Sequence, residues 1–134
     1  MPVAYSIDSA RGLIRTTCSG PVTSKEVIEH FRTLRQDPLC AGKLDVLLNV
    51  SDCNLIPESS DLGLVVAELR AFPGEAPFRL CAIVAASDTM FGMMRMFEVF
   101  AGKHFRAIRV FRDLTAAETW LVSPEMDPPA NRPH

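Results

Sequence analysis

The polar and apolar positions of this 134-residue chain change period several times, and each period indicates one kind of element. Alternation in 3–8 (VAYSID) and 12–18 (GLIRTTC), on either side of a short turn, predicts a β-hairpin. Nearly continuous apolar runs at 44–50 (LDVLLNV) and 78–85 (FRLCAIVA) are typical of strands buried on both faces of a sheet. The run at 105–111 (FRAIRVF) carries two arginines, which favours a strand near a sheet edge.

Helical spacing of apolar residues follows each of the last four predicted strands. Thr23 and Glu26 have the spacing of a capping box, which predicts the start of the first helix. The second helix is expected to open at Ser59 and the third to cover 87–103. Asp113 or Thr115 is expected to cap the fourth. The predicted order is therefore β-β-α-β-α-β-α-β-α.

This order predicts an α/β fold. Strands that alternate with helices pair in parallel through right-handed crossovers, and the opening hairpin adds an antiparallel pair. We therefore expect a mixed five-stranded sheet with four helices, formed by a single domain over 1–122. The segment 123–134 (SPEMDPPANRPH) holds four prolines and no core candidates, so we expect it to be a disordered tail.

Composition narrows the classes of function. The net charge of −2 gives no bulk attraction for nucleic acid, and no apolar run of about 20 residues predicts a transmembrane segment. No pair of cysteines has a C-x-x-C spacing or a nearby histidine, so we expect neither a metal site nor a cofactor. The first residues lack a signal-peptide pattern, and we expect a cytoplasmic protein with reduced thiols. The cysteines are Cys18, Cys40, Cys53 and Cys81.

The third predicted helix is more apolar than a helix on a sheet requires. Its apolar side chains fill an arc of roughly 220°, whereas a little over about 100° is enough to cover a core. Four methionines in this helix suit an adaptable contact surface. Leu64 also falls outside the apolar stripe of the second helix. The candidate contact residues are Leu64, Met90, Met93, Met94, Met96, Phe97 and Phe100.

The sequence is compatible with four different contacts for this apolar surface. A homodimer interface would bury it between two copies. A small apolar ligand could lie between this helix and its neighbours. A membrane surface could receive it, with Lys103, His104 and Arg106 near lipid headgroups. Ordinary core packing within one domain is the fourth.

The element order together with four stretches resembles the STAS fold, and most closely its SpoIIAA-like branch. The resemblance covers residues 3 to about 122. It implies a small bacterial protein of this fold, with distant similarity in architecture to the CRAL-TRIO lipid-binding proteins. The stretches that carry it are the turn 20–23 (GPVT), 44–52 (LDVLLNVSD), 91–98 (FGMMRMFE) and, most specifically, 110–121 (VFRDLTAAETWL).

The resemblance also implies a regulatory site at the start of the second helix. Anti-anti-sigma members of the fold carry Asp-Ser-Ser-Gly-Leu-Gly there, and a partner kinase phosphorylates one of the serines. The matching residues here are 58–63 (ESSDLG), so Ser59 and Ser60 are phospho-acceptor candidates. Phosphate would place negative charge at the positive end of a helix. Alternatively, these serines only cap the helix.

Two functions follow from these patterns. We expect a non-enzymatic binding or regulatory module that acts through protein–protein contact, as a homodimer or with a regulatory partner. The alternative is a carrier or sensor of a small apolar ligand or lipid, with transient contact to a membrane surface. An enzyme has weak support, because only Asp52 and Asp88 follow parallel strands at the end where α/β ligands bind.

Overall fold

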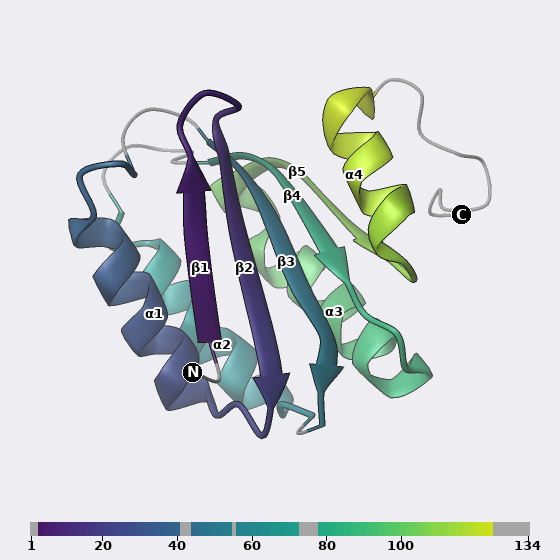
Figure 1. Cartoon of the computed structure of the whole chain (residues 1–134). Helices are drawn as coiled ribbons and strands as arrows, with labels where there is room; N and C mark the ends of the chain where they lie inside the picture. The colour runs from purple at the N-terminus through teal and green to yellow at the C-terminus, as the bar shows by residue number, and fades with distance from the viewer. Residues whose placement is uncertain (1–2, 41–43, 55, 73–77, 125–134) are drawn as a thin grey trace.

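The computed structural model describes residues 3–40, 44–54, 56–72 and 78–124 of the chain. The predicted class is confirmed: a mixed five-stranded sheet is accompanied by four α-helices (Figure 1). The strands are β1 (Val3–Asp8), β2 (Leu13–Gly20), β3 (Leu44–Cys53), β4 (Phe78–Val84) and β5 (Phe105–Phe111). The helices are α1 (Ser24–Gln36), α2 (Ser59–Leu69), α3 (Asp88–Ala101) and α4 (Leu114–Val122), and a 3-10 turn at Gly102–His104 follows α3.

The strands lie in the sheet in the same order as in the chain, β1-β2-β3-β4-β5. β1 and β2 form the predicted antiparallel hairpin, and every later pair is parallel. Because consecutive right-handed crossovers run in one direction, α1, α2 and α3 all fall on the same face. Figure 1 shows these three helices behind the sheet and α4 in front of it. The predicted edge position of β5 is confirmed.

The helix starts follow the predicted caps in part. At α1 the capping box is confirmed, since Thr23 N donates to Glu26 Oε1 at 3.1 Å and Glu26 N donates to Thr23 Oγ1 at 3.3 Å. At α4 the cap is Asp113, whose Oδ1 accepts from the backbone N–H of Ala116 at 2.8 Å. Thr115 lies inside this helix and is not its cap.

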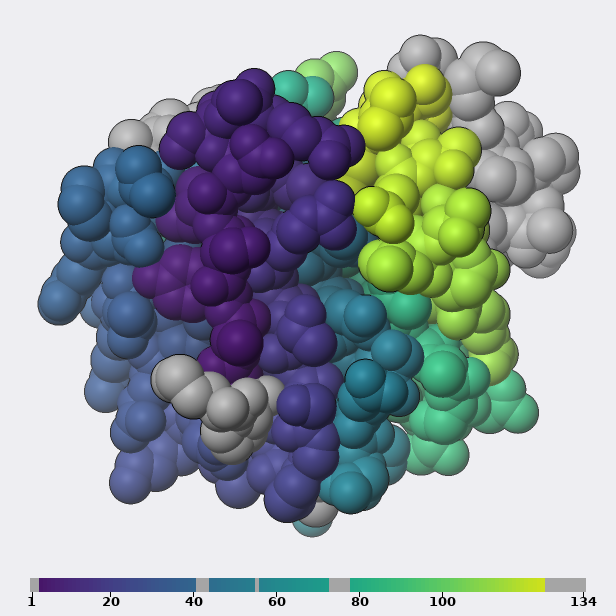
Figure 2. Space-filling model, viewed as in Figure 1, coloured from purple at the N-terminus to yellow at the C-terminus, as the bar shows by residue number. Residues whose placement is uncertain are grey.

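The two faces of the sheet carry separate cores. On one face, side chains of all five strands pack under α1, α2 and α3. On the other, a smaller core forms under α4, from residues of β2 to β5 and from the helix itself. α4 lies mainly over β3, β4 and β5, and Figure 2 shows β1 and β2 at the surface beside it.

Two predictions, the disordered tail and the lack of a transmembrane segment, can be compared only with the described part of the chain. The expected disordered tail falls at 123–134, and residues 125–134 of it lie outside the described residues. Within the described part, no helix is long and apolar enough to cross a membrane.

Candidate functional site

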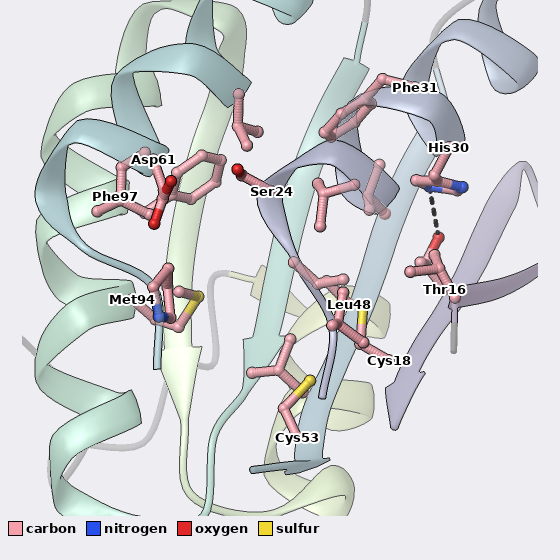
Figure 3. A pocket seen from close by; sticks show the side chains of 18 of the residues that line it. Thr16, Cys18, Ser24, His30, Phe31, Leu48, Cys53, Asp61, Met94 and Phe97 are labelled. Atoms are coloured by element: carbon pink, nitrogen blue, oxygen red, sulfur yellow. Dashed lines mark hydrogen bonds between the residues drawn. The ribbon is translucent and has the colours of Figure 1, made fainter. Parts of the chain in front are cut away.

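A cavity of about 120 Å³ lies between the sheet and the three helices of its larger core. Side chains from all five strands and from α1, α2 and α3 line it, and Figure 3 shows many of them. The lining is almost entirely apolar. Its apolar members include Val3, Val27, Phe31, Val46, Leu48, Leu62, Val65, Phe78, Met90, Met94, Phe97 and Phe105.

The central strand shows that the space above it is not filled. β3 lies in the middle of the sheet, where side chains are normally covered on both faces. Leu47 points to the α4 side and is 3% exposed. Val46 and Leu48 point to the three-helix side and are only half-buried. The helices therefore leave a gap over the centre of the sheet.

Ion pairs join α1 and α2 near their C-terminal ends. Arg32 Nη2 lies 2.9 Å from Glu68 Oε1, and Arg35 Nη1 lies 3.5 Å from Glu68 Oε2. The hydrogen bond from Arg32 is the main cause that lowers the pKa of Glu68. The guanidinium of Arg35 also lies 5.8 Å from the centre of the Phe72 ring. These contacts fix the spacing of the two helices at this end.

Most of the polar lining residues, among them the exposed Thr23, lie at the opposite end of the same helices. Thr23 and Ser24 begin α1, Asp61 lies in the first turn of α2, and Cys53 ends β3. Figure 3 shows Ser24 and Asp61 extending from α1 and α2 toward the gap between these helices. The mouth of the cavity is therefore at the carboxyl ends of the parallel strands, the usual position for a ligand in an α/β sheet.

A row of contacting rings passes along the cavity, and four of its members, His30, Phe31, Phe78 and Phe105, belong to the lining. Phe78 and Phe105 begin β4 and β5, and their rings stack with centroids 5.4 Å apart. Neighbouring rings continue the row at centroid distances between 5.1 and 6.3 Å. The full row is Tyr5, His30, Phe31, Phe72, Phe78 and Phe105.

Two polar side chains face one another within the lining. Thr16 of β2 is 3% exposed, and its Oγ1 lies 3.4 Å from Nε2 of His30 on α1 (Figure 3). Burial lowers the pKa of His30 to about 4, so its imidazole is neutral at pH 7. The pair can therefore offer both a donor and an acceptor to an uncharged group.

The two lining cysteines next to the mouth are thiols rather than thiolates. Burial raises the pKa of Cys18 to about 12, with a smaller contribution from Cys53. Burial also raises the pKa of Cys53. Because the thiolate is the nucleophilic form, neither residue is activated for covalent chemistry at pH 7. The described residues also contain no group of three or more His, Cys, Asp or Glu that could hold a metal ion.

The candidate residues of α3 divide between the cavity and the surface. Met90, Met94 and Phe97 are buried and line the cavity, and Met93 is half-buried. Met96 and Phe100 are exposed on the outer side of the helix. Val99, on the same side, is 78% exposed, and Leu64 of α2 is 53% exposed. The wide apolar arc is thus two stripes with different surroundings.

The serines at the start of α2 do not cap it, so that expectation is wrong. Glu58 occupies the N-cap position, and Ser59 and Ser60 are the first two helical residues. The backbone N–H of Glu58 donates to Asp61 Oδ2 at 2.9 Å. Both serines are exposed to solvent. Phosphorylation of either one stays a prediction.

The acidic pair considered for catalysis does not form part of the cavity. Asp52 belongs to β3 itself, near its end, and Asp88 is the first residue of α3. Arg112 Nη1 lies 2.6 Å from Asp88 Oδ1, so this carboxylate is already paired. Neither aspartate lines the cavity.

Sequence reasoning missed the polar pair and the half-buried residues of β3. A weak signal was present. Thr16 interrupts the inward-facing series Ile14 and Cys18 of its strand, and His30 interrupts the apolar stripe of α1. One polar residue on each of two facing elements predicts a pair only once the elements are known to pack together.

Comparison of the chain with protein-family models, with curated proteins and with solved structures gives no match.

Proposed function

We propose that this protein binds a small apolar ligand in the cavity between its sheet and helices α1, α2 and α3. The observation that supports this most directly is the unfilled space above the central strand, beside the half-buried Val46 and Leu48. Protein interiors are normally packed without such voids, because each unfilled volume forfeits contacts. A ligand that fills it recovers those contacts and removes its own apolar surface from water.

The volume limits the size of the ligand. An engineered apolar cavity of about 150 Å³ stays dry and binds benzene, whereas pockets for drug-sized ligands span roughly 300–1,000 Å³. A cavity of about 120 Å³ suits a small or slender molecule. Bulkier ligands would require α1 and α2 to separate at their N-terminal ends, since the ion pairs of Glu68 hold the other ends together.

The methionines of α3 provide a direct test with an internal control. Protein labelled with ¹³C at the methionine methyl groups is titrated with 1-octanol and followed by NMR. Met90 and Met94 line the cavity, while Met96 lies on the outer side of the same helix. We expect the methyl signals of Met90 and Met94 to shift in a saturable way while that of Met96 does not. Signals that stay unshifted up to the solubility limit of octanol would contradict the proposal.

A variant that fills the cavity provides the second test. Leu48→Phe adds a ring to the half-buried side of β3, and Leu39→Phe makes the same change at an exposed loop position. We expect Leu48→Phe to lose octanol binding while it keeps the melting temperature of the wild type. Leu39→Phe should bind like the wild type. Equal binding by both variants would show that octanol does not occupy this cavity.

A second candidate function is supported by the outer stripe of α3. Met96, Val99 and Phe100 expose apolar surface at helical spacing, which is a pattern typical of a contact between two proteins. The homodimer predicted from the sequence would place two such stripes together. Sedimentation velocity should then show a smaller species for Val99→Asp than for the wild type. Thr119→Asp, an exposed position on the opposite face, is the control.

The SpoIIAA-like assignment, the regulatory role and the cytoplasmic location remain proposals from the sequence. The element order and the exposed Ser59 and Ser60 are compatible with them. Intact mass of protein purified from its native host would test the regulatory role, because a phosphorylated serine adds the mass of one phosphate. A single unmodified species under all growth conditions would contradict it.

A further inference from the structure

The charges around the cavity limit which ligands it can hold. Among the described residues that line it there is no lysine or arginine, and the titratable groups other than the cysteines are Asp61 and His30. Burial keeps His30 neutral, with a pKa of about 4. At the mouth, the first turn of α1 carries Lys25 and Glu26, and Glu58 and Asp61 begin α2, so acidic groups outnumber the one basic group among the described residues there. An anionic group that enters would lose its water and meet no cation within the described lining.

The inner polar pair shows where an uncharged polar group would go. The 3.4 Å between Thr16 Oγ1 and His30 Nε2 is long beside the usual 2.7–3.2 Å of a good hydrogen bond. A hydroxyl or carbonyl oxygen placed beside the two side chains would complete their hydrogen bonding. Among the described residues, this long contact is the one hydrogen bond that Thr16 Oγ1 and His30 Nε2 make, although the His30 ring also packs against Tyr5 and Phe31.

The shape of the cavity favours a slender molecule. Its lining runs from Val3 on β1 to Phe105 on β5, across the full width of the sheet. Four inter-strand steps of about 4.8 Å place these two strands about 19 Å apart. A volume of about 120 Å³ spread over that width forms a narrow slot. Thr16 and His30 lie toward the β1 side, and Met94 and Phe97 lie on the far side (Figure 3).

We infer that the ligand is an uncharged amphiphile with a linear aliphatic chain and one hydroxyl or carbonyl group, which binds Thr16 and His30. This inference rests on the proposed function and adds the chemical class of the ligand. The chain lies along the slot toward Met94 and Phe97. Free fatty acids, which are anionic at pH 7, are disfavoured because the described lining holds no cation and acidic groups outnumber Lys25 at the mouth.

Two probes of equal chain length test the class of ligand. 1-Octanol and octanoate are titrated at pH 7.5 into protein labelled at the methionine methyls. We expect octanol to bind at least tenfold more tightly than octanoate. Octanoate that binds as tightly as octanol would overturn the inference while the proposed function stands. If neither probe shifts Met90 or Met94, the proposed function itself fails, and the inference fails with it.

A matched pair of threonine variants tests the position of the polar group. Thr16→Val removes the hydroxyl with little change of shape, and Thr33→Val makes the same change at an exposed position of α1. One hydrogen bond of ordinary strength corresponds to about a 2- to 10-fold loss of octanol affinity in Thr16→Val. Thr33→Val should leave the affinity unchanged.

Butylbenzene, a probe without a polar group, separates a lost hydrogen bond from a general change in the cavity. We expect Thr16→Val to bind butylbenzene as tightly as the wild type does. Equal weakening of both probes would show that Thr16 acts only through packing, and octanol affinity unchanged in Thr16→Val would show that the hydroxyl binds elsewhere. Either result would overturn the placement. Circular dichroism confirms that each variant is folded.

Discussion

The two faces of the sheet are packed differently, although the same strands supply both. Under α4, the side chains of Ala82, Phe111 and Ala117 are fully buried and Trp120 is 3% exposed. The rings of Phe111 and Trp120 lie with centroids 5.7 Å apart. Under α1, α2 and α3, more residues are brought together, yet a cavity remains. The α4 face also has a recess, of about 150 Å³, but it lies beside the C-terminal end of α4 and polar groups such as Arg15, Asp45 and Glu118 line it. The apolar cavity lies within the larger core.

The reason lies in what sets the height of each helix above the sheet. α4 rests on the sheet through one large aromatic side chain that fits between its neighbours. α1 and α2 are held to each other by Arg32, Arg35 and Glu68, and α1 to β1 by the hydrogen bond from Tyr5 to Asp37, 2.7 Å long. These polar contacts at the periphery hold the helices in place without requiring the centre to be filled. The apolar cavity is therefore under α1, α2 and α3, whereas Trp120 and its neighbours pack together in the core under α4.

The largest expected effect is on the closely packed face. Trp120→Ala removes the buried side chain that fills the α4 core, and we expect it to lower the free energy of unfolding by about 3–5 kcal/mol. Chemical denaturation followed by circular dichroism measures this loss. A loss below about 1 kcal/mol would mean that α4 contributes little and that the contrast between the faces is wrong.

Adjacent leucines of β3 compare the two faces within one strand. Leu47 points to the α4 core and Leu48 to the cavity. We expect Leu47→Ala to cost about 2–5 kcal/mol, because it creates a new void in a filled core. Leu48→Ala should cost about 1 kcal/mol, because half-buried surface is lost beside a void that already exists. Urea denaturation of both variants measures the difference, and equal losses would contradict the presence of the cavity.

The pH dependence of stability tests the burial of His30. The pKa of His30 is about 4 in the folded protein and near 6.5 in the unfolded chain. Between these values the unfolded chain binds the additional proton, so stability falls as the pH falls. We expect a loss on the order of 2 kcal/mol between pH 7 and pH 5 from this residue, since each pKa unit corresponds to 1.36 kcal/mol.

The variant His30→Gln keeps a polar side chain and cannot titrate, so its stability should change less over this range. Burial also lowers the pKa of His104, which leaves a smaller slope of the same sign in the variant. Denaturation at pH 7, 6 and 5 compares the two proteins. Identical slopes would show that His30 is solvated and that the inner part of the cavity is open to water.

The smallest expected effect is on the outer stripe of α3. Val99→Asp changes a side chain that is 78% exposed, so we expect the free energy of unfolding to change by no more than about 0.5 kcal/mol. Met94→Asp, on the cavity side of the same helix, should instead unfold the protein or lower its stability severely, since it buries a charge. Thermal denaturation distinguishes the two, and similar melting temperatures would contradict the division of α3 into two stripes.

Local patterns along the chain were sufficient to predict the elements and their order. Strict alternation, continuous apolar runs and the Thr23–Glu26 capping box are local signals, and they predicted five strands and four helices correctly. The order of alternating strands and helices then restricted the topology, because crossovers are right-handed. Local competition between side chains was harder to predict, as at α2, where Glu58 and not a serine occupies the N-cap.

The contacts of the apolar surface of α3, and the existence of the cavity, depend on how distant parts of the chain pack together. The helical period shows which residues share a face, but a 220° arc of apolar residues has the same pattern whether it faces a core, a ligand or a partner. The height of α1 and α2 above the sheet depends on contacts between residues far apart in the chain, such as Arg32 with Glu68. The pairing of Thr16 with His30 depends on how α1 packs on β2, which no local pattern encodes.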